Sequence, residues 1–412
     1  MDYPIIFIPG LFGSLGDDVI KGTGNFSFGL AERVYRPFIE ILNSMGYEEG
    51  INLFISYYDW KKPVLEATEK YLSPTIEKVK RKTGMSKVIL IGHSLGGLLA
   101  RSYIEYFSPS SVDKLIMIGT PNLGSIDAYY FWSGGKLPYP KVEENLLYNG
   151  LKIAFIIYYH LFLKINYIEV LRDKFPVTKD LLPSYGYGNY LLYKKGETKK
   201  EIPIEDMTIS NSFLNGMEKN PISRDNLFII SGKGVYTNQK FIVDKNNKEK
   251  IKWADGKPNN VYKTTYGDGT VTTVSTLGNL CKNNITLEGN HIDILYKSKD
   301  YLSHILCKDI NEKIERQEVE KIYVIFGHNC RKINVRTPNL NEVSSESINI
   351  TDSRVQAVNL SFNRFWIMAA GNKNLEIDLD IEPIKRVKPQ IYMAIIDKEG
   401  AKFEFNPLKN KI

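Results

Sequence analysis

Cysteine is scarce in this sequence. The 412 residues include 3 cysteines, Cys281, Cys307 and Cys330. A sparse and odd set of cysteines excludes the dense disulfide framework of small secreted domains and favours a reducing compartment.

A long apolar run is also missing. The nearest approach to a membrane span is LKIAFIIYYHLFLKINYIEVL, residues 151–171. Its uncharged core, Ile153 to Leu163, has 11 residues. A helix of that length is about 16 Å long, whereas a span needs about 20 residues. The N-terminus, MDYPIIFIPG, has neither the basic region nor the apolar run of a signal peptide. We therefore expect a protein that is cytoplasmic or peripherally associated with a membrane.

A strong charge of either sign is absent too. The sequence has 54 Lys and Arg residues against 47 Asp and Glu residues, which gives a net charge of +7. This excess is too small for a nucleic-acid footprint, so we expect no nucleic-acid partner, although it favours approach to an anionic surface. With 43% hydrophobic and 25% charged residues, the composition is that of a globular protein. The length favours two domains, or one domain with an insertion.

The sequence does contain a regular alternation of short apolar runs with helical patterns. The strand-like runs are at residues 4–8, 51–57, 87–92, 112–119 and 226–232, and the helix-like segments are at residues 31–45, 64–82 and from residue 95 onward. Continuous apolar runs of this kind predict a mostly parallel sheet with helices on both faces, which is an α/β fold.

Two regions break this alternation. Residues 126–225 are rich in Tyr, Lys and Leu and contain several prolines, and we interpret them as an inserted helical cap. Residues 319–412 contain seven or eight short alternating segments joined by Asn, Gly and Pro turns, which predict a C-terminal β-sandwich. The expected organisation is a main domain at residues 1–318, with the cap inserted, and an accessory domain at residues 319–412.

The stretch GHSLGG, residues 92–97, matches the pattern G-x-S-x-G. The pattern alone is weak, but here an apolar strand precedes it and a helical pattern follows it, which is the context of a nucleophile elbow. Such a turn holds the hydroxyl of Ser94 at the carboxyl edge of the sheet. The alternative is a glycine-rich helix start in which Ser94 serves as the cap.

An acid and a base have to follow the serine in this type of fold. Asp268 stands between two glycines in YGDGTV, directly after a strand-like run, although Asp-Gly is also an ordinary hairpin turn. Among the 5 histidines, His291 follows a strand-like run and opens a helix, as a catalytic imidazole would. His304 is the alternative base, and His93 lies in the elbow itself, pointing away from the hydroxyl.

An oxyanion hole needs backbone donors near the nucleophile. The N–H of Leu95, at the helix start, is one candidate, and the N–H of Leu11, in FIPGLFGS after the first strand, is the other. Phe12 is the alternative to Leu11. No His or Cys cluster suggests a metal site, and a Ser-His-Asp mechanism requires no cofactor, so we expect neither metal nor cofactor.

Five motifs occur in the order found in one family: IPGLFGS, YYDW, GHSLGG, GTPNLGS and YGDGTV. They resemble those of the lecithin:cholesterol acyltransferase-like and lysosomal phospholipase A2-like lipases, over roughly residues 4–308. The resemblance implies an α/β-hydrolase fold and an enzyme acting on acyl esters of lipids through an acyl-enzyme. It makes Ser94 the nucleophile, Asp268 the acid and His291 the base, with Leu11 and Leu95 as the oxyanion donors. Lys61 stands where the family usually has arginine.

The expected function is therefore that of a serine lipase, phospholipase or transacylase. The alternatives are a short-chain carboxylesterase and a non-catalytic lipid- or partner-binding protein with a hydrolase fold. The cap is the expected point of peripheral contact with a membrane. The sequence leaves acyl chain, head group, acceptor and oligomeric state open.

Overall fold

The computed structural model describes residues 2–18, 21–134, 172–217, 224–245, 253–278, 280, 282–311, 319–337, 340–344, 350–351, 355–360 and 363–405. Its centre is a six-stranded sheet with the strand order β12-β9-β6-β5-β1-β4, in which every pairing is parallel. The strands are β1 (Ile5–Ile8), β4 (Leu53–Ile55), β5 (Val88–His93), β6 (Val112–Ile118), β9 (Leu227–Lys233) and β12 (Asn284–Glu288). The predicted α/β fold is confirmed, and its core strands lie within about two residues of the apolar runs.

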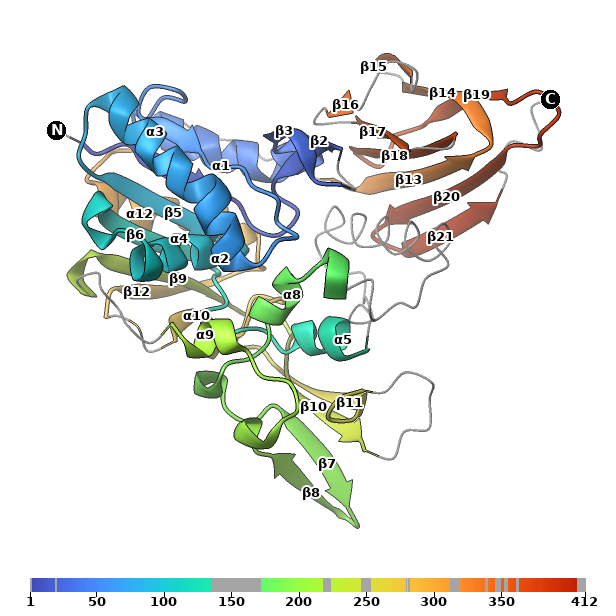
Figure 1. The fold of residues 1–412 in the computed structure, drawn as a ribbon. Coiled ribbons are helices and arrows are strands. Elements are labelled where there is room, and N and C mark those ends of the chain that lie inside the picture. The colour runs from blue at the N-terminus through green and yellow to red at the C-terminus, as the bar shows by residue number, and fades with distance from the viewer. Residues whose placement is uncertain are drawn as a thin grey trace. The chain divides into compact units, whose positions relative to one another are not determined.

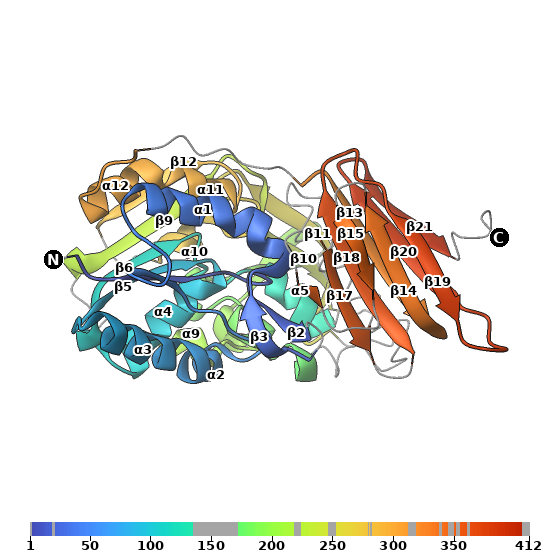
Figure 2. The ribbon, with the colours of Figure 1, turned by 90° about the horizontal axis from the view of Figure 1, so that it is seen from above.

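Helices cover both faces of this sheet (Figures 1 and 2). One face carries α1 (Glu32–Ser44), α11 (Asp293–Lys297) and α12 (Lys299–Leu306), and the other carries α2 (Val64–Ala67), α3 (Ser73–Thr83) and α4 (Leu95–Tyr106). A single π-helical turn, η2 (Thr68–Leu72), joins α2 to α3. Pro74, which has no backbone N–H to donate, follows it in the first turn of α3.

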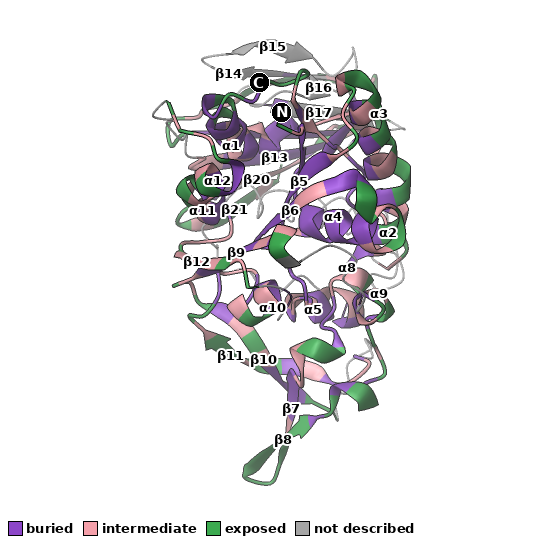
Figure 3. Ribbon diagram, turned by 90° about the vertical axis from the view of Figure 1, so that its left-hand side faces the viewer, coloured by how far each residue is buried: buried purple, intermediate pink, exposed green. Residues whose placement is uncertain are grey.

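The central strands are apolar on both faces because helices cover both. All four residues of β1 and all six of β5 are buried, which is the pattern of a parallel sheet enclosed between helical layers. Figure 3 shows this buried core beside the exposed outer turns of the helices. The sheet is therefore a rigid base for the loops at its carboxyl edge.

The segment inserted between β6 and β9 contains both helices and strands in its described part. Its elements are α5 (Asp127–Gly134), α8 (Val177–Asp180), η5 (Tyr185–Tyr187), β7 (Leu191–Lys195), β8 (Thr198–Ile202), η6 (Ile204–Asp206), α9 (Ser212–Asn215) and η7 (Arg224–Asn226). The strands β7 and β8 join β10 (Thr237–Asp244) and β11 (Lys257–Thr264) in a second sheet, ordered β11-β10-β7-β8. The expected cap therefore contains a hairpin as well as helices. The apolar stretch at residues 151–171 lies outside the described residues.

The C-terminal region is an antiparallel β domain, as the sequence predicted. One sheet has the order β16-β17-β18-β13-β20-β21 and the other has the order β15-β14-β19. The strands are β13 (Lys321–His328), β14 (Cys330–Thr337), β15 (Leu340–Ser344), β16 (Ile350–Thr351), β17 (Val355–Leu360), β18 (Arg364–Gly371), β19 (Asp378–Pro383), β20 (Gln390–Asp397) and β21 (Gly400–Phe405). Apolar residues of both sheets, among them Ile325 and Leu379, share one cluster between them.

The chain divides into two compact units. The first comprises the described residues of 1–11, 37–139 and 166–314, and the second those of 12–36 and 315–412. The second unit therefore includes the hairpin of β2 (Leu15–Asp18) and β3 (Thr23–Ser27) and the 3-10 turn η1 (Gly29–Ala31), which precede most of the first unit in sequence. The boundary at residues 318/319 stays a prediction. Within the described part of the chain, no helix is long and apolar enough to cross a membrane.

Candidate active site

Ser94 occupies the sharp turn between β5 and α4. Its backbone angles are φ 52° and ψ −123°, and its side chain makes no capping hydrogen bond to the helix. A non-glycine residue held at such angles costs of order 1–3 kcal/mol and persists only where the surrounding structure enforces it. The cap alternative from the sequence therefore has no support, and the turn has the geometry of a nucleophile elbow.

Glycines make this turn sterically feasible. A Cβ atom on Gly92 would lie 2.5 Å from the Cα of Gly97, and one on Gly96 would lie 2.2 Å from the carbonyl oxygen of Ile8. Both distances are far inside van der Waals contact, so a side chain at either glycine would push α4 away from β5 or β1. The glycines thus let the helix start directly over the strand ends.

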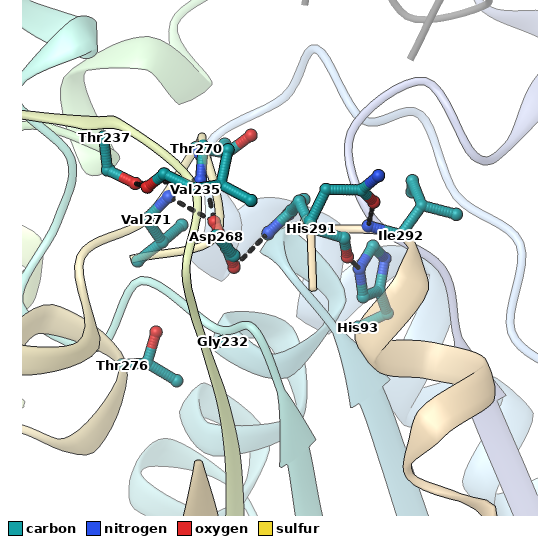
Figure 4. Close-up of polar contacts among 12 residues, drawn as sticks. His93, Gly232, Val235, Thr237, Asp268, Thr270, Val271, Thr276, His291 and Ile292 are labelled. Atoms are coloured by element: carbon teal, nitrogen blue, oxygen red, sulfur yellow. Dashed lines mark hydrogen bonds and ion pairs between the residues drawn. The ribbon is translucent and has the colours of Figure 1, made fainter. Parts of the chain in front are cut away.

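Asp268 and His291 form a hydrogen-bonded pair. The Nδ1 atom of His291 lies 2.7 Å from Oδ2 of Asp268, and Asp268 is 1% exposed. The other carboxylate oxygen accepts backbone N–H bonds from Thr270 (2.9 Å) and Val271 (2.7 Å). These donors leave Oδ2 directed at the imidazole, as Figure 4 shows. The Nδ1 atom accordingly carries the hydrogen, and Nε2 is left as the proton acceptor.

Asp268 lies at the end of β9, although β10 and β11 separate the two in sequence. It forms a bridge with Val235, and a Cβ atom on Gly232 would lie 2.6 Å from its own Cβ. The sequence placed the acid after the strand-like run that became β11, but that strand belongs to the second sheet. The chain leaves the main sheet after β9, forms β10 and β11, and returns to the same edge.

His291 follows β12 and lies over the end of β6. A Cβ atom on Gly119, which has φ +60°, would lie 3.0 Å from Cε1 of His291. The Nε2 atom of His291 is buried and has no hydrogen-bond partner among the described residues. The alternative base, His304, is exposed on α12. Of these two histidines, His291 is the one hydrogen-bonded to Asp268.

The loop after β1 adjoins Ser94. A Cβ atom on Gly10 would lie 2.9 Å from the Cβ of Ser94, so the backbone that leads into Leu11 passes directly beside the serine. Phe12, the alternative donor, has φ 61°. The hydroxyl of Tyr58, which is fully buried, donates to the carbonyl oxygen of Pro9 at 2.8 Å. This hydrogen bond ties the loop after β1 to a buried side chain.

His93 is a part of the site to which the sequence assigned no role. Its ring is 1% exposed, its Nε2 lies 3.0 Å from the carbonyl oxygen of His291, and the two ring centroids are 4.8 Å apart. Burial, and next the neighbouring His291, hold the pKa of His93 well below 6.5. Its place inside GHSLGG was a signal in the sequence, but its partner lies 198 residues further along the chain.

The YYDW motif forms a buried cluster in the first unit. The carboxylate of Asp59 lies 3.8 Å from Nζ of Lys61, and both side chains are almost fully buried. Burial raises the pKa of Asp59 and the Lys61 ammonium opposes that rise. Trp60 stacks on Phe175 with ring centroids 5.6 Å apart. Lysine thus supplies the cation at the position where the resembling family usually has arginine.

The described residues include no group of three or more His, Cys, Asp or Glu side chains that could hold a metal ion. The expectation of a metal-free site stays a prediction. The chemistry available from these residues is that of a serine, an imidazole and a carboxylate.

Comparison with known proteins shows what parts of this chain are similar to. Residues 26–162 match the family model of lecithin:cholesterol acyltransferase. Phospholipase A(1) LCAT3 of Arabidopsis thaliana is 31% identical over 96 residues, which is 22% of this chain and 21% of that protein. The triacylglycerol lipase of Pseudarthrobacter phenanthrenivorans is 28% identical over 127 residues, which is 30% of this chain and 34% of the lipase. The chain therefore spans about a fifth to a third of these curated relatives.

Two solved structures are also similar to this chain. Bacillus licheniformis lipase BlEst2 in its propeptide form has 12% identity and a TM-score of 0.40, over 98% of this chain and 93% of that one. EstA from Clostridium botulinum has 14% identity and a TM-score of 0.32, over 76% of this chain and 88% of that one. Over the matched residues 26–162 the chain is therefore similar to the lecithin:cholesterol acyltransferase family, and its parallel sheet has the α/β-hydrolase fold.

Proposed function

We propose that this protein is a serine hydrolase that cleaves acyl esters of lipids through an acyl-enzyme intermediate. The observation that carries the proposal is the 2.7 Å hydrogen bond between Asp268 and His291, together with the strained backbone of Ser94. A strained serine between a strand and a helix supports nucleophilic catalysis, and so does a carboxylate-oriented imidazole whose Nε2 has no hydrogen-bond partner among the described residues.

In the proposed mechanism, Nε2 of His291 takes the proton of Ser94 as the hydroxyl oxygen forms a bond to the ester carbonyl carbon. Asp268 keeps the imidazole in the Nδ1–H tautomer and stabilises the cation that forms. The backbone N–H groups of Leu11 and Leu95 donate to the oxyanion. The leaving alcohol takes the proton from His291, and water or an acceptor alcohol then attacks the acyl-enzyme with His291 again as the base.

Support for lipid as the substrate class comes from the family. The curated relatives are a phospholipase A1 and triacylglycerol lipases, and the matching family is named for acyl transfer between lipids. Peripheral membrane contact through the cap remains part of the proposal. Residues 151–171, on which that contact depends, lie outside the described residues.

Substitution of the three residues tests the mechanism. Ser94→Ala, Asp268→Asn and His291→Ala should each lower kcat for a soluble p-nitrophenyl ester by a factor of about 10³ or more, with unchanged circular dichroism. His304→Ala, on an exposed site of α12, is the matched control and should retain activity. If His304→Ala lost activity while His291→Ala kept it, the assignment of the base would be wrong.

Two further measurements separate the alternatives. A fluorophosphonate probe should label Ser94 in the wild type, whereas a non-catalytic binding protein would stay unlabelled. Mass spectrometry of a mixed phospholipid and neutral-lipid extract, after incubation with the enzyme, should show free fatty acid for a lipase or phospholipase. New acylated alcohols would indicate a transacylase, and an unchanged extract with active cleavage of short esters would indicate a carboxylesterase.

A further inference from the structure

We propose that His93 is a positioning residue for the base: its side-chain N–H holds the main-chain carbonyl of His291 and so fixes the imidazole relative to the neighbouring Ser94. This inference rests on the proposed function, because it assigns His93 to the same site. It concerns a residue that contacts neither the substrate carbonyl nor the transferred proton. His93 acts through the position of His291.

The contact defines the state of His93. A carbonyl oxygen only accepts hydrogen bonds, so the Nε2 atom that lies 3.0 Å from it carries the hydrogen. The ring is 1% exposed and lies 4.8 Å from the ring of His291. A second cation there would be disfavoured by desolvation and by repulsion whenever His291 is protonated. His93 therefore serves as a neutral donor while His291 gains and loses its proton.

The bond joins two parts of the site that are otherwise distant in the sheet. His93 ends β5, and His291 follows β12, with β6 and β9 between these strands. Three strand spacings of about 4.8 Å amount to about 14 Å of sheet. The loop of His291 has other anchors, namely the Gly289 N–H to the carbonyl of Lys233 (3.0 Å) and the Asn290 side chain, which accepts from Ile292 (3.0 Å) and Asp293 (2.9 Å). These anchors tie the loop to the edge of the sheet and to its own helix, whereas His93 ties it to the nucleophile elbow (Figure 4).

His93 is itself held in place by close packing. A Cβ atom on Gly10 would lie 3.1 Å from Nδ1 of His93 and 2.9 Å from the Cβ of Ser94. The imidazole of His93 is therefore confined between the loop after β1 and the loop after β12. Because His93 precedes Ser94 by one residue, a shift of the base loop away from the elbow lengthens the hydrogen bond between His93 and the His291 carbonyl.

The expected effect follows from the geometry of proton transfer. A misplacement of about 1 Å can cost about 10²-fold in rate. His93→Leu keeps most of the ring's bulk and removes the donor, so its kcat for a soluble p-nitrophenyl ester should fall about 10- to 100-fold. The KM should change less than about twofold, because no substrate contact is lost. Labelling of Ser94 by a fluorophosphonate should slow by a similar factor.

A conservative pair separates positioning from packing. His93→Gln has an amide N–H near the position of Nε2 and should recover most of the wild-type kcat, whereas the shorter His93→Asn has its amide near Nδ1 and should not. Thermal unfolding of all variants provides the check on folding, and His304→Gln is the control for a histidine outside the site.

Three outcomes would overturn the inference: a folded His93→Leu with near wild-type kcat, a His93→Gln as slow as His93→Asn at equal melting temperature, or a loss confined to KM. If His93→Leu fails to fold, the Gln and Asn pair decides. Failure of the proposed function is distinguishable, because Ser94→Ala would then leave the measured activity unchanged.

Discussion

The hydroxyl of Tyr58 is one group on which the loop after β1 depends. It donates to the carbonyl oxygen of Pro9 at 2.8 Å from a fully buried ring, and Pro9 lies two residues before Leu11. Tyr58→Phe should leave that carbonyl unpaired and cost about 1–3 kcal/mol of the free energy of unfolding. Loss of an oxyanion donor lowers kcat by a factor of about 10²–10³. Displacement of the Leu11 N–H, without its loss, should therefore lower kcat by about tenfold. Steady-state kinetics on a soluble ester and denaturant unfolding measure both effects.

Tyr106→Phe is the matched control for this change. Tyr106 ends α4 and is 45% exposed, so the loss of its hydroxyl should alter neither kcat nor unfolding measurably. A Tyr58→Phe protein with wild-type kcat would show that the Pro9 bond does not govern the oxyanion loop.

Some residues of the candidate site stand in local sequence patterns and others do not. Ser94 stands in a local pattern whose turn geometry follows from its glycines, and Asp268 and His291 each sit in recognisable short motifs. The bonds of His93 and Tyr58 join residues 198 and 49 positions apart. Such contacts depend on which strands become neighbours in the sheet, and no local pattern encodes that order.

At the scale of elements, α8 is joined to α2 by one carboxylate. Oδ2 of Asp180, the last residue of α8, accepts the backbone N–H of Val64 at 2.7 Å. That N–H belongs to the first residue of α2, where the preceding Pro63 provides no side-chain cap. Asp180 thus supplies the cap from another part of the chain, at a helix end that favours negative charge. Burial nevertheless raises the pKa of Asp180 from 3.8 to about 6.

This raised pKa predicts a pH dependence of stability. Because the folded protein binds the proton of Asp180 more tightly than the unfolded chain does, the contribution of this group is fully present below pH 3.8 and is lost as the pH rises through about 6. Asp180→Asn retains an acceptor for Val64 and does not titrate. The melting temperature of Asp180→Asn relative to wild type should therefore rise between pH 4 and about pH 7 and then level off.

Calorimetry at a series of pH values measures this difference. Asp206→Asn, at an exposed position in η6, is the control, and its difference from wild type should not follow the same curve. A pH-independent difference for Asp180→Asn would mean that Asp180 has the same pKa in the folded and unfolded protein.

The strands of the main sheet could be predicted from the sequence because their apolar runs are continuous. The hairpin of β7 and β8 was not, because its sequence, LLYKKGETKKEI, is largely polar. Its buried residues, among them Leu191 and Ile202, belong to the same hydrophobic cluster as Phe241 of β10, the strand that pairs with β7. Tertiary pairing with a strand about 50 residues later stabilises it, and a local pattern carries little of that information.

At the scale of the whole molecule, the two compact units interleave in sequence. Residues 12–36 belong to the same unit as the described residues of 315–412, where β2 contacts β16 and η1 contacts β17. Leu15 of β2 and Leu30 of η1 are 1% and 0% exposed. The predicted boundary at residues 318/319 places residues 12–36 in the main domain. Contacts between residues more than 300 positions apart leave no trace in local composition, so this grouping could not be predicted from the sequence. This segment begins directly after Leu11, so the proposed oxyanion loop adjoins it in the chain.

Removal of residues 319–412 should therefore affect more than an accessory domain. The truncated chain loses the contacts of β16 and β17 with β2 and η1, and burial of a leucine stabilises by about 1.5–3 kcal/mol. We expect a melting temperature lower by several degrees and a severalfold loss of kcat on a soluble ester, because residues 12–36 no longer have the partners that order them. Truncation after Glu399 removes β21, which pairs with β20, and retains β16 and β17. This shorter deletion is the matched control and should keep wild-type kcat on the soluble ester. A chain ending at residue 318 with the wild-type melting temperature and kcat would show that residues 12–36 fold independently of the C-terminal strands.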